Sequence, residues 1–375
     1  MEEYKYLAIV DWSKNYIQSG HLKPNDRFLS EKELCSIHGV SRQTVRQALK
    51  CLENENVIYR VRGSGTFVKS GNTKPAVQNR CVGVISTYFS DYIFPSIVTG
   101  IESVLNESGI AMQLSITHNQ VCEEAQALRT MIANGVQGLI VEPSKSALPN
   151  PNTELYQEIR KNNIPLVYFN AKYPWAEFPY AAMNDEAAGQ IVTDYLFDCG
   201  HKRICGIFAL DDIQGHKRYS GFMKSNIAHG IRTAENSVLW FATAEKSAIF
   251  QYAESKLLEM IRSSTAIVCY NDKLAVNLLR FCREHDISVP DDISVVGIDD
   301  SKYSKICDVP LTTVRHPHQI LGEMAAKMLI EQMNAPAEHQ NDCIFVPELV
   351  IRDSVKVMEP AETEEEAPDS DHISA

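Results

Sequence analysis

Apolar residues along the chain follow two patterns, and the change between them falls between residues 70 and 80. In the first 70 residues they recur every three or four positions, which predicts amphipathic helices. From residue 80 onward, short continuous apolar runs alternate with amphipathic stretches. Buried parallel strands covered by helices on both faces have this second pattern. The chain is therefore predicted to have a small helical head and a larger α/β body.

The head is predicted to hold three helices. The first stops at Gly20, and its stripe at helical spacing is Tyr6, Ile9, Val10, Ser13 and Ile17. A second helix starts after Ser30, because Ser30 and Glu33 have the spacing of a reciprocal capping box. It ends at Gly39, which tolerates the positive φ of a tight turn. Ser41 then caps a third helix.

The third helix has an apolar and a polar face. The apolar face consists of Val45, Ala48, Leu49 and Leu52. The polar face consists of Arg42, Gln43, Arg46, Gln47 and Lys50. The helix-turn-helix pattern consists of a helix, a glycine turn and a second helix with Arg and Gln on its outer face. In the major groove, Arg pairs with guanine and Gln with adenine. An isolated helix of this kind is more often only a solvated surface, and that alternative has to be weighed.

A glycine-rich hairpin after the third helix favours DNA binding over the solvated surface. Residues 57–61 alternate as a strand, residues 62–65 form a turn, and residues 66–68 return. Arg60 and Arg62 lie near the tip of this wing, where arginine suits the negative potential of a narrow minor groove. The glycines of the turn allow the backbone to approach phosphate closely.

Short motifs run through almost the whole head. They are Gly20-x-Leu22-x-Pro24, Asp26-Arg27, Ser30-Glu31-x-Glu33-Leu34, Val40-Ser-Arg-x-Thr-Val-Arg46, Ala48-Leu49 and Gly63-x-Gly-Thr-Phe-Val68. They strongly resemble the winged helix-turn-helix of the gluconate-repressor (GntR) family. The resemblance implies that Arg42, Thr44 and Arg46 meet the major groove, and it places Arg62 and Gly63 at the minor groove. The residues expected to bind DNA are Glu31, Ser41, Arg42, Gln43, Thr44, Arg46, Arg60, Arg62, Gly63 and Gly65.

The body reads as two doubly wound lobes, because some 280 residues exceed one parallel sheet. Its predicted strands are 82–86, 111–116, 138–142, 165–169, 203–208, 266–270 and 293–298, with helices at 97–108, 123–134, 187–199, 248–263 and 273–285. The expected divisions are a head at 1–70, a linker at 71–79, a first lobe at about 80–183 and 315–339, a second lobe at about 184–314 and 340–358, and an acidic tail at 359–375. The fold class is thus α/β, with an N-terminal winged helix-turn-helix and a two-lobed, periplasmic-binding-protein-like body.

Polar residues gather after several of these strands, at the edge where parallel sheets bind ligands. Carboxylates, amides and an Arg beside aromatic side chains suit a sugar, whose hydroxyls need donors and acceptors and whose apolar face stacks on an aromatic ring. Capping of the following helices is the alternative for each Asp or Asn taken alone. The convergence of several such positions favours a binding site. The residues expected to bind the effector are Tyr88, Asp91, Tyr92, Glu142, Arg218, Asn271, Asp272, Asp299 and His316.

The body also carries motifs of a known family. They are Asn271-Asp-Lys-Leu-Ala275, Val289-Pro-Asp-Asp-Ile-Ser-Val-Val-Gly-Ile-Asp-Asp300 and Leu311-Thr-Thr-Val-Arg315. They resemble the effector domain of the lac repressor (LacI) family, in which the residues matching Arg218, Asn271 and Asp299 hold sugar hydroxyls. Three further motifs are Tyr88-x-Ser-Asp-Tyr-Ile-Phe-Pro95, Glu142-Pro-x-Lys-Ser-Ala147 and Asp212-x-Gln-Gly-x-Lys-Arg218. With them, a GntR-type head on a LacI-type body resembles the bacterial arabinose repressors more narrowly, which implies L-arabinose as the effector. The identity of the sugar rests wholly on that resemblance.

Charge is distributed unevenly. The net charge of −12 argues against nucleic acid only if it is spread evenly. Residues 1–75 carry 12 basic and 8 acidic side chains, whereas residues 359–375 carry 7 acidic and no basic ones. The positive part is the predicted DNA-binding head, and the acidic tail is expected to be disordered and solvated.

Other function classes lack support. The ten cysteines have no CxxC or Cys/His ligand spacing, and the chain has no G-x-S-x-G, H-E-x-x-H or Walker-type motif, so neither a metal, a cofactor nor an enzyme activity is expected. The N-terminus is acidic and no apolar run approaches membrane length, which predicts a soluble cytoplasmic protein.

The leading hypothesis is a homodimeric, sugar-responsive transcriptional repressor that binds double-stranded operator DNA. Three alternatives stay open: a sugar receptor that does not bind DNA, a regulator of the same architecture that responds to another sugar, and an α/β enzyme. Repression or activation, the operator sequence and the direction of the effector's influence on DNA binding also stay open.

Overall fold

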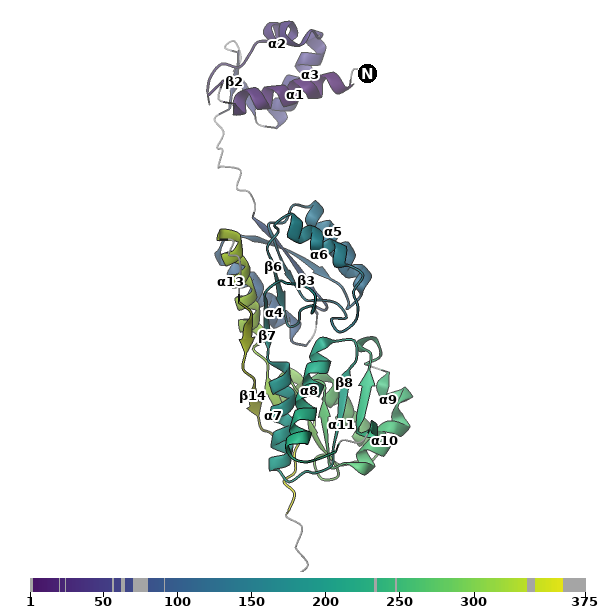
Figure 1. The fold of residues 1–375 in the computed structure, drawn as a ribbon. Helices are drawn as coiled ribbons and strands as arrows, with labels where there is room; N and C mark the ends of the chain where they lie inside the picture. Colours follow the sequence, from purple (N-terminus) through teal and green to yellow (C-terminus); the bar gives the residue numbers. More distant parts are fainter. Residues whose placement is uncertain are drawn as a thin grey trace, which may run out of the picture. The chain divides into compact units, whose positions relative to one another are not determined.

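The structure, a computed structural model, describes residues 3–19, 21–23, 25–55, 57–61, 65–69, 80–90, 92–232, 235–246, 248–335 and 341–359. The chain divides into two compact units between Asn79 and Arg80. Figure 1 shows the helical first unit and the larger second unit, which contains both lobes of the body. No helix among the described residues is long and apolar enough to cross a membrane. The predicted linker and residues 360–375 of the predicted tail lie outside the described residues.

The head folds as three helices and a two-stranded wing. Its elements are α1 (Glu3–Gln18), α2 (Glu31–His38), α3 (Arg42–Asn54), β1 (Ile58–Val61) and β2 (Gly65–Val68). The capping box is confirmed: the amide of Ser30 donates to Glu33 Oε2 at 2.7 Å, and the amide of Glu33 donates to Ser30 Oγ at 3.3 Å. Gly39 adopts the expected left-handed conformation, with φ of 63°. The predicted inner face of the third helix is also confirmed, since Val45, Ala48, Leu49 and Leu52 are all buried.

The first lobe is a six-stranded parallel sheet covered by helices on both faces (Figure 1). The sheet order is β13-β7-β6-β5-β3-β4. The elements are β3 (Cys81–Ser86), α4 (Phe94–Glu107), β4 (Ala111–Ile116), α5 (Val121–Ala133), β5 (Gly138–Val141), α6 (Thr153–Lys161), β6 (Leu166–Phe169), β7 (Tyr180–Met183), α13 (His318–Asn334) and β13 (Cys343–Phe345). Helices α4 and α13 pack together over one core, and α5 and α6 cover the other.

The second lobe is a four-stranded parallel sheet of order β11-β10-β8-β9. Its elements are α7 (Asp185–Asp198), β8 (Ile204–Ala209), α8 (Ile213–Ala228), β9 (Val238–Phe241), α9 (Ile249–Tyr252), α10 (Glu254–Ser263), β10 (Ala266–Cys269), α11 (Asp272–Glu284), β11 (Ser294–Val296) and α12 (Lys302–Ile306), with 3-10 turns η1 (Glu235–Ser237) and η2 (Thr243–Glu245). The expected helix at 248–263 is two helices, because the backbone leaves the helical conformation at Ala253. The doubly wound α/β body predicted from the apolar runs is thus confirmed.

The chain crosses between the lobes three times. After β7 the chain passes from the first lobe to the second. It returns to the first lobe through β12 (Thr313–Arg315), and it passes to the second lobe again between β13 and β14 (Glu348–Val350). Strands β12 and β14 pair with each other in an antiparallel ladder. One expected boundary is wrong: β13 pairs with β7, so residues 343–345 belong to the first lobe rather than to the second. The sequence placed them incorrectly because a run of three apolar residues does not indicate which of the two sheets it joins.

Candidate functional sites

The outer face of α3 is the candidate DNA surface. Arg42, Gln43 and Arg46 are exposed at the start of this helix. Ser41 caps it, since its Oγ accepts a hydrogen bond from the amide of Thr44 at 3.3 Å. The cap fixes the helix N-terminus, the part of a recognition helix that contacts base edges. Arg42, Gln43, Thr44 and Arg46 are therefore carried on one rigid element.

Glu31 acts on this surface through Arg46. The Nε of Arg46 donates to both carboxylate oxygens of Glu31, at 3.2 Å and 3.0 Å. This ion pair links α2 to α3 across an exposed surface and orients the guanidinium group. A single exposed pair contributes only about 0.2–1 kcal/mol to stability, so its value lies in positioning.

The described residues of the wing are those of its two strands, and its tip at residues 62–64 lies outside them. Arg60 lies 3.7 Å from Glu53, between its Nε and a carboxylate oxygen. Gly65 has φ of 120°, a conformation that other residues rarely adopt, and the Arg27 side chain packs against it. Arg62 and Gly63, both expected at the minor groove, lie outside the described residues.

A cavity of about 440 Å³ lies in the body and is lined by residues of both lobes. This volume is within the usual range of small-molecule sites. Six of the expected effector residues line it: Tyr88, Tyr92, Glu142, Arg218, Asn271 and Asp299. Asp91 lies outside the described residues. Among the described residues, no group of His, Cys, Asp and Glu side chains is arranged to hold a metal ion.

Arg218 holds the second-lobe side of the cavity together. Its side chain is 2% exposed, and its Nε donates to Asp185 Oδ1 at 2.9 Å while its Nη2 donates to Asp299 Oδ1 at 3.0 Å. Its Nη1 donates to the carbonyl oxygen of Tyr270 at 2.6 Å. A buried guanidinium with a carboxylate on either side is fixed in one orientation, so it can present its charge to a ligand without rearrangement.

A close helix contact allows this arrangement. A Cβ at Gly189 of α7 would lie 2.0 Å from the carbonyl oxygen of Arg218 on α8, so only glycine permits the two helices to approach so closely. Burial raises the pKa of Asp185 to about 6, although the neighbouring Arg218 opposes this rise. At neutral pH Asp185 is therefore mostly ionised and serves as a counter-charge.

Glu142 organises the first-lobe side. Its Oε2 accepts hydrogen bonds from the amide of Thr87 at 2.8 Å and the hydroxyl of Thr87 at 2.5 Å, and its Oε1 accepts one from Asn170 Nδ2 at 2.7 Å. Burial raises the pKa of Glu142, while the Thr87 and Asn170 hydrogen bonds oppose that rise. The Oδ1 of Asn170 is buried and has no hydrogen-bond partner among the described residues. It is therefore an acceptor available for a ligand hydroxyl.

Direct hydrogen bonds connect the two lobes around the cavity. The hydroxyl of Tyr92 donates to Asp299 Oδ2 at 2.5 Å. Asn119 Nδ2 donates to Thr243 Oγ1 at 2.6 Å, and Ser146 Oγ donates to Asp212 Oδ1 at 3.0 Å. Each pair takes one residue from each lobe. A change in the angle between the lobes would have to break these bonds, so they link occupancy of the cavity to the shape of the body.

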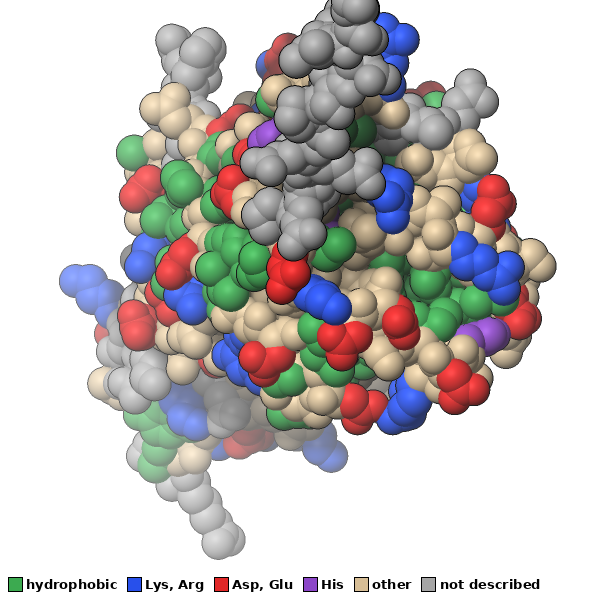
Figure 2. Space-filling view, turned by 90° about the horizontal axis from the view of Figure 1, so that it is seen from below, with side chains coloured by type: hydrophobic (Ala, Val, Ile, Leu, Met, Phe, Trp, Pro, Cys, Tyr) green, Lys and Arg blue, Asp and Glu red, His purple; other side chains and the backbone are tan. Residues whose placement is uncertain are grey.

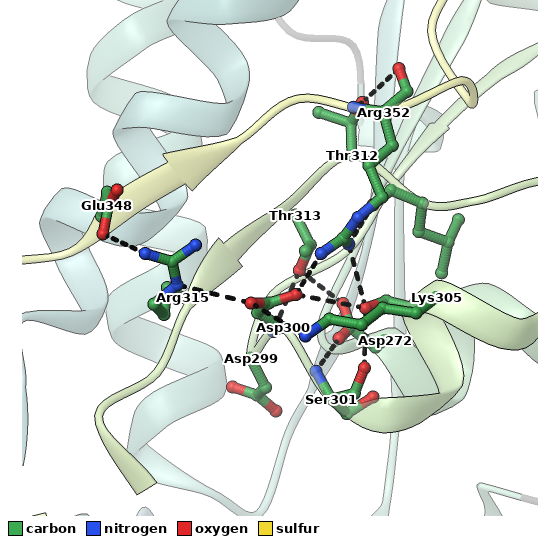
Figure 3. Close-up of polar contacts among 12 residues, drawn as sticks. Asp272, Asp299, Asp300, Ser301, Lys305, Thr312, Thr313, Arg315, Glu348 and Arg352 are labelled. Carbon is green, nitrogen blue, oxygen red and sulfur yellow. Dashed lines mark hydrogen bonds and ion pairs between the residues drawn. The ribbon is translucent and has the colours of Figure 1, made fainter. Parts of the chain in front are cut away.

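Asp272 is not placed at the cavity, although it follows a strand end. Its Oδ2 accepts from the amide of Ser301 at 2.7 Å, and Thr313 Oγ1 donates to its Oδ1 at 2.5 Å. Figure 3 shows these contacts and shows the Asp299 side chain turned away from them. The expectation that Asp272 contacts the effector does not match this placement. Its carboxylate instead connects the start of α11 to the crossing strand β12.

His316 is likewise absent from the cavity wall. It is 2% exposed, and neither ring nitrogen has a hydrogen-bond partner among the described residues. Its ring stacks on that of His318, with centroids 5.1 Å apart, and burial lowers its pKa well below the usual value. His318 contacts the cavity indirectly, since its Nε2 lies 2.8 Å from the carbonyl oxygen of Asp299. His316 is therefore a neutral residue behind the site.

We expect the variant Asp272→Asn to lose less stability than the wild type between pH 7 and pH 9. Burial, with Asp299 nearby, raises the pKa of Asp272 to about 8. The folded state therefore keeps a proton that the unfolded state has released, and the free energy of unfolding falls as the pH rises through 8, by about 1 kcal/mol. Asparagine has the same shape and does not ionise.

Urea unfolding at pH 7, 8 and 9 measures this difference. The exposed Asp291, whose Oδ1 lies 3.3 Å from Lys356 Nζ, provides the control variant Asp291→Asn, which should follow the wild type. Parallel loss of stability in the Asp272→Asn protein and the wild type would contradict the assignment.

Several cavity residues were not among the expected ones. They include Asn119, Asn170, Asp212, Gln214, Phe241, Lys246, Tyr270 and Asn277. Tyr270 is the last residue of the predicted strand 266–270, and Asp212 lies four residues beyond the predicted strand 203–208, so that signal was present. Asn170 directly follows a predicted strand and could have been found in the same way. Asn277 lies inside a helix, where the sequence gives no such signal.

The chain matches two family descriptions and has named relatives. Residues 5–68 match "Bacterial regulatory proteins, gntR family", and residues 193–355 match "Periplasmic binding protein-like domain". The chain is 41% identical to the arabinose metabolism transcriptional repressor of Geobacillus stearothermophilus, over 94% of this chain and 98% of the relative. It is 38% identical to the protein of the same name from Halalkalibacterium halodurans, over 94% of this chain and 96% of that one. The chain belongs to the family of these repressors.

Both of these relatives are named as transcriptional repressors, which are regulators and not enzymes. The chain is therefore a GntR-headed, LacI-like transcriptional regulator, as the sequence predicted. The fold agrees: the transcription regulator CcpA of Lactococcus lactis superimposes with a TM-score of 0.66 at 24% identity, over 74% of this chain and 99% of that chain. The enzyme alternative is excluded by this family membership.

Proposed function

We propose that this repressor binds L-arabinose in the cavity between its lobes and that the sugar changes its affinity for the operators of arabinose-utilisation genes. It would act in the cytoplasm as a homodimer on a two-fold operator. A single small winged head makes few base contacts, and two heads spanning adjacent major grooves supply the rest.

The buried polar groups of the cavity carry this proposal. Arg218 and Asp299 offer a fixed donor and a fixed acceptor, and Asn170 Oδ1 lacks a partner. An unpaired buried acceptor costs about 1–3 kcal/mol, which a ligand hydroxyl would recover. Aromatic side chains such as Tyr88 and Phe241 line the same cavity and suit the apolar face of a sugar ring.

The choice of arabinose among sugars comes from the relatives. Both are named arabinose metabolism transcriptional repressors, and the chain aligns with nearly their full length. Calorimetry of the purified protein against a panel of pentoses and hexoses tests the choice. We expect L-arabinose to bind most tightly, and tighter binding of another sugar would contradict it.

Operator binding is tested by mobility shift on promoter DNA of arabinose-utilisation genes, with and without the sugar, at several salt concentrations. We expect binding that weakens as salt rises, because phosphate contacts release counterions. We also expect the sugar to change the affinity. An absence of salt-dependent DNA binding would favour the alternative of a sugar receptor.

We expect Arg46→Ala to weaken operator binding by about 1–3 kcal/mol, because the recognition helix loses one base-contacting guanidinium. The same variant should bind the sugar as the wild type does, since Arg46 belongs to the head and not to the body. The variant Lys5→Ala, which removes an exposed cation from α1, is the matched control. Equal operator affinity of Arg46→Ala and the wild type would refute the assigned role.

A further inference from the structure

A second pocket, of about 270 Å³, lies at the other end of the second lobe from the effector cavity. Its lining residues lie before or at the starts of β8, β9 and β10, whereas most residues of the effector cavity lie at or beyond the carboxyl ends of strands. Because the strands are parallel, these two sites are at opposite edges of the sheet. In the view from below in Figure 2, Lys and Arg side chains (blue) occur at several places on the surface, interspersed with Asp and Glu side chains (red).

The second pocket is basic. Lys202, Arg203 and Arg232 line it, all three are exposed, and none of them forms an ion pair with a described residue. One acidic residue, Glu259, lines the same pocket, and its carboxylate is 3.6 Å from Lys256 Nζ. Arg guanidinium groups bind carboxylates in pairs of parallel hydrogen bonds. The pocket is therefore suited to a ligand with several carboxylates.

The described chain ends beside this pocket. The amide of Met358 donates to the carbonyl oxygen of Cys199 at 2.8 Å, and His201 Nε2 lies 2.9 Å from the carbonyl oxygen of Lys356. These contacts hold the last described residues against the turn that leads into Lys202 and Arg203. The segment that follows Glu359 therefore begins next to the basic pocket.

The sequence that follows is acidic. Residues 359–375 contain seven Asp and Glu and no Lys or Arg, and residues 364–366 are three consecutive Glu. An extended chain covers roughly 3.3–3.6 Å per residue, so Glu364 can reach about 17 Å from Glu359. The Cα atoms of Gly200 and Arg203 are at most about 11 Å apart along the chain. The acidic residues are thus within reach of the pocket.

We propose that residues 360–375 dock in this basic pocket of the same chain, with Glu carboxylates paired to Lys202, Arg203 and Arg232. A short tether gives the tail an effective concentration in the millimolar range, so ion pairs that are weak individually suffice. The pocket is then a site for the chain's own acidic segment, distinct from the effector cavity and from the DNA surface.

A chain that ends at Glu359 makes the pocket available for a test in trans. A labelled synthetic peptide of residues 360–375 is titrated into this truncated protein and into the full chain by fluorescence anisotropy at low salt. We expect binding to the truncated protein that weakens as salt rises, and at least tenfold weaker binding to the full chain, where the tail occupies the pocket.

Substitutions in the truncated protein locate the binding site. Arg203→Glu/Arg232→Glu should abolish peptide binding, whereas Arg129→Glu, which reverses an exposed cation of α5, should not. Equal binding by the full and truncated proteins, or binding that survives the double substitution, would overturn the proposal. Inorganic phosphate that displaces the peptide at equal concentration would assign the pocket to a small anion instead.

Carbodiimide cross-linking tests the contact in the full chain. This reagent joins an amine to a carboxylate in direct contact, and mass spectrometry should find Lys202 linked to an acidic residue of 360–375. The link should be absent in the Lys202→Arg variant. A mixture of ¹⁴N- and ¹⁵N-labelled chains shows whether both peptides come from one chain. Links only between different chains, or no link at all, would contradict docking within the chain.

Discussion

Replacing Asp299 by alanine is expected to abolish the response to the sugar while leaving operator binding intact. Asp299 is 2% exposed, lines the cavity, accepts from Arg218 on one oxygen and accepts from Tyr92 on the other. Its loss removes an acceptor for the sugar and one of the bonds between the lobes. A hydrogen bond to a charged group is worth about 1.5–3 kcal/mol, so sugar affinity should fall by about 10- to 100-fold.

Two measurements on the Asp299→Ala variant distinguish a loss of sugar binding from a loss of operator binding. Calorimetry gives the sugar affinity, and mobility shift with and without sugar gives the operator response. The control Asp291→Ala removes an exposed carboxylate from the same lobe and should match the wild type in both. An unchanged sugar titration for Asp299→Ala would show that the cavity is not the effector site.

Replacing Arg218 by methionine is expected to lower the free energy of unfolding at pH 7 by about 3–5 kcal/mol, because it leaves buried carboxylates without a counter-charge. Both Asp185 and Asp299 lose their ion-pair partner. The loss should shrink as the pH falls from 7 to 5, because Asp185, whose pKa is already about 6, takes up a proton in the folded state.

The matched control for Arg218→Met is Arg315→Met. Arg315 also forms two ion pairs, with Asp300 and Glu348, but its side chain is 52% exposed (Figure 3). The pair with Glu348 is exposed, and the buried Asp300 keeps Arg352 as a partner, so this variant should lose at most about 1 kcal/mol. Urea unfolding followed by tryptophan fluorescence reports on the body through Trp175 and Trp240, and the signal of Trp12 in the head is common to all variants. Equal losses for the two variants would mean that burial of Arg218 has no special importance.

Much of the fold could be predicted because the central strands of both sheets of the body are buried on both faces. Strands such as β5 and β10 are continuous apolar runs, which are typical of a covered parallel sheet. The strands β12, β13 and β14 have three residues each and are partly exposed, so their sequences carry no comparable pattern. Their positions depend on contacts between distant segments. The lobe boundary near residue 343 was wrong for this reason.

Some residues of the candidate effector site could be predicted from the sequence, and others could not. Asp299 follows a predicted strand, and its place at the cavity agrees with the expectation. Asp272 also begins the segment after a strand, yet its side chain points to Ser301 and Thr313, since only the three-dimensional packing decides which of two neighbouring residues faces the ligand. Asp185 resembles an ordinary residue of a first helical turn. Its ion pair with Arg218, 33 residues away, has no local signature in the sequence.

The threading of the chain through both lobes sets an order for their completion during synthesis. The core of the first lobe includes Leu321 and Leu329 of α13, although its sheet begins at Cys81. At about 5–20 residues per second, the roughly 150 residues between β7 and the end of that core take about 7–30 s to translate. The four strands of the second lobe are all made by Val296. The lobe that begins second can therefore close first, while a nascent first lobe, covered on that face by α4 alone, keeps part of its apolar core exposed on the ribosome.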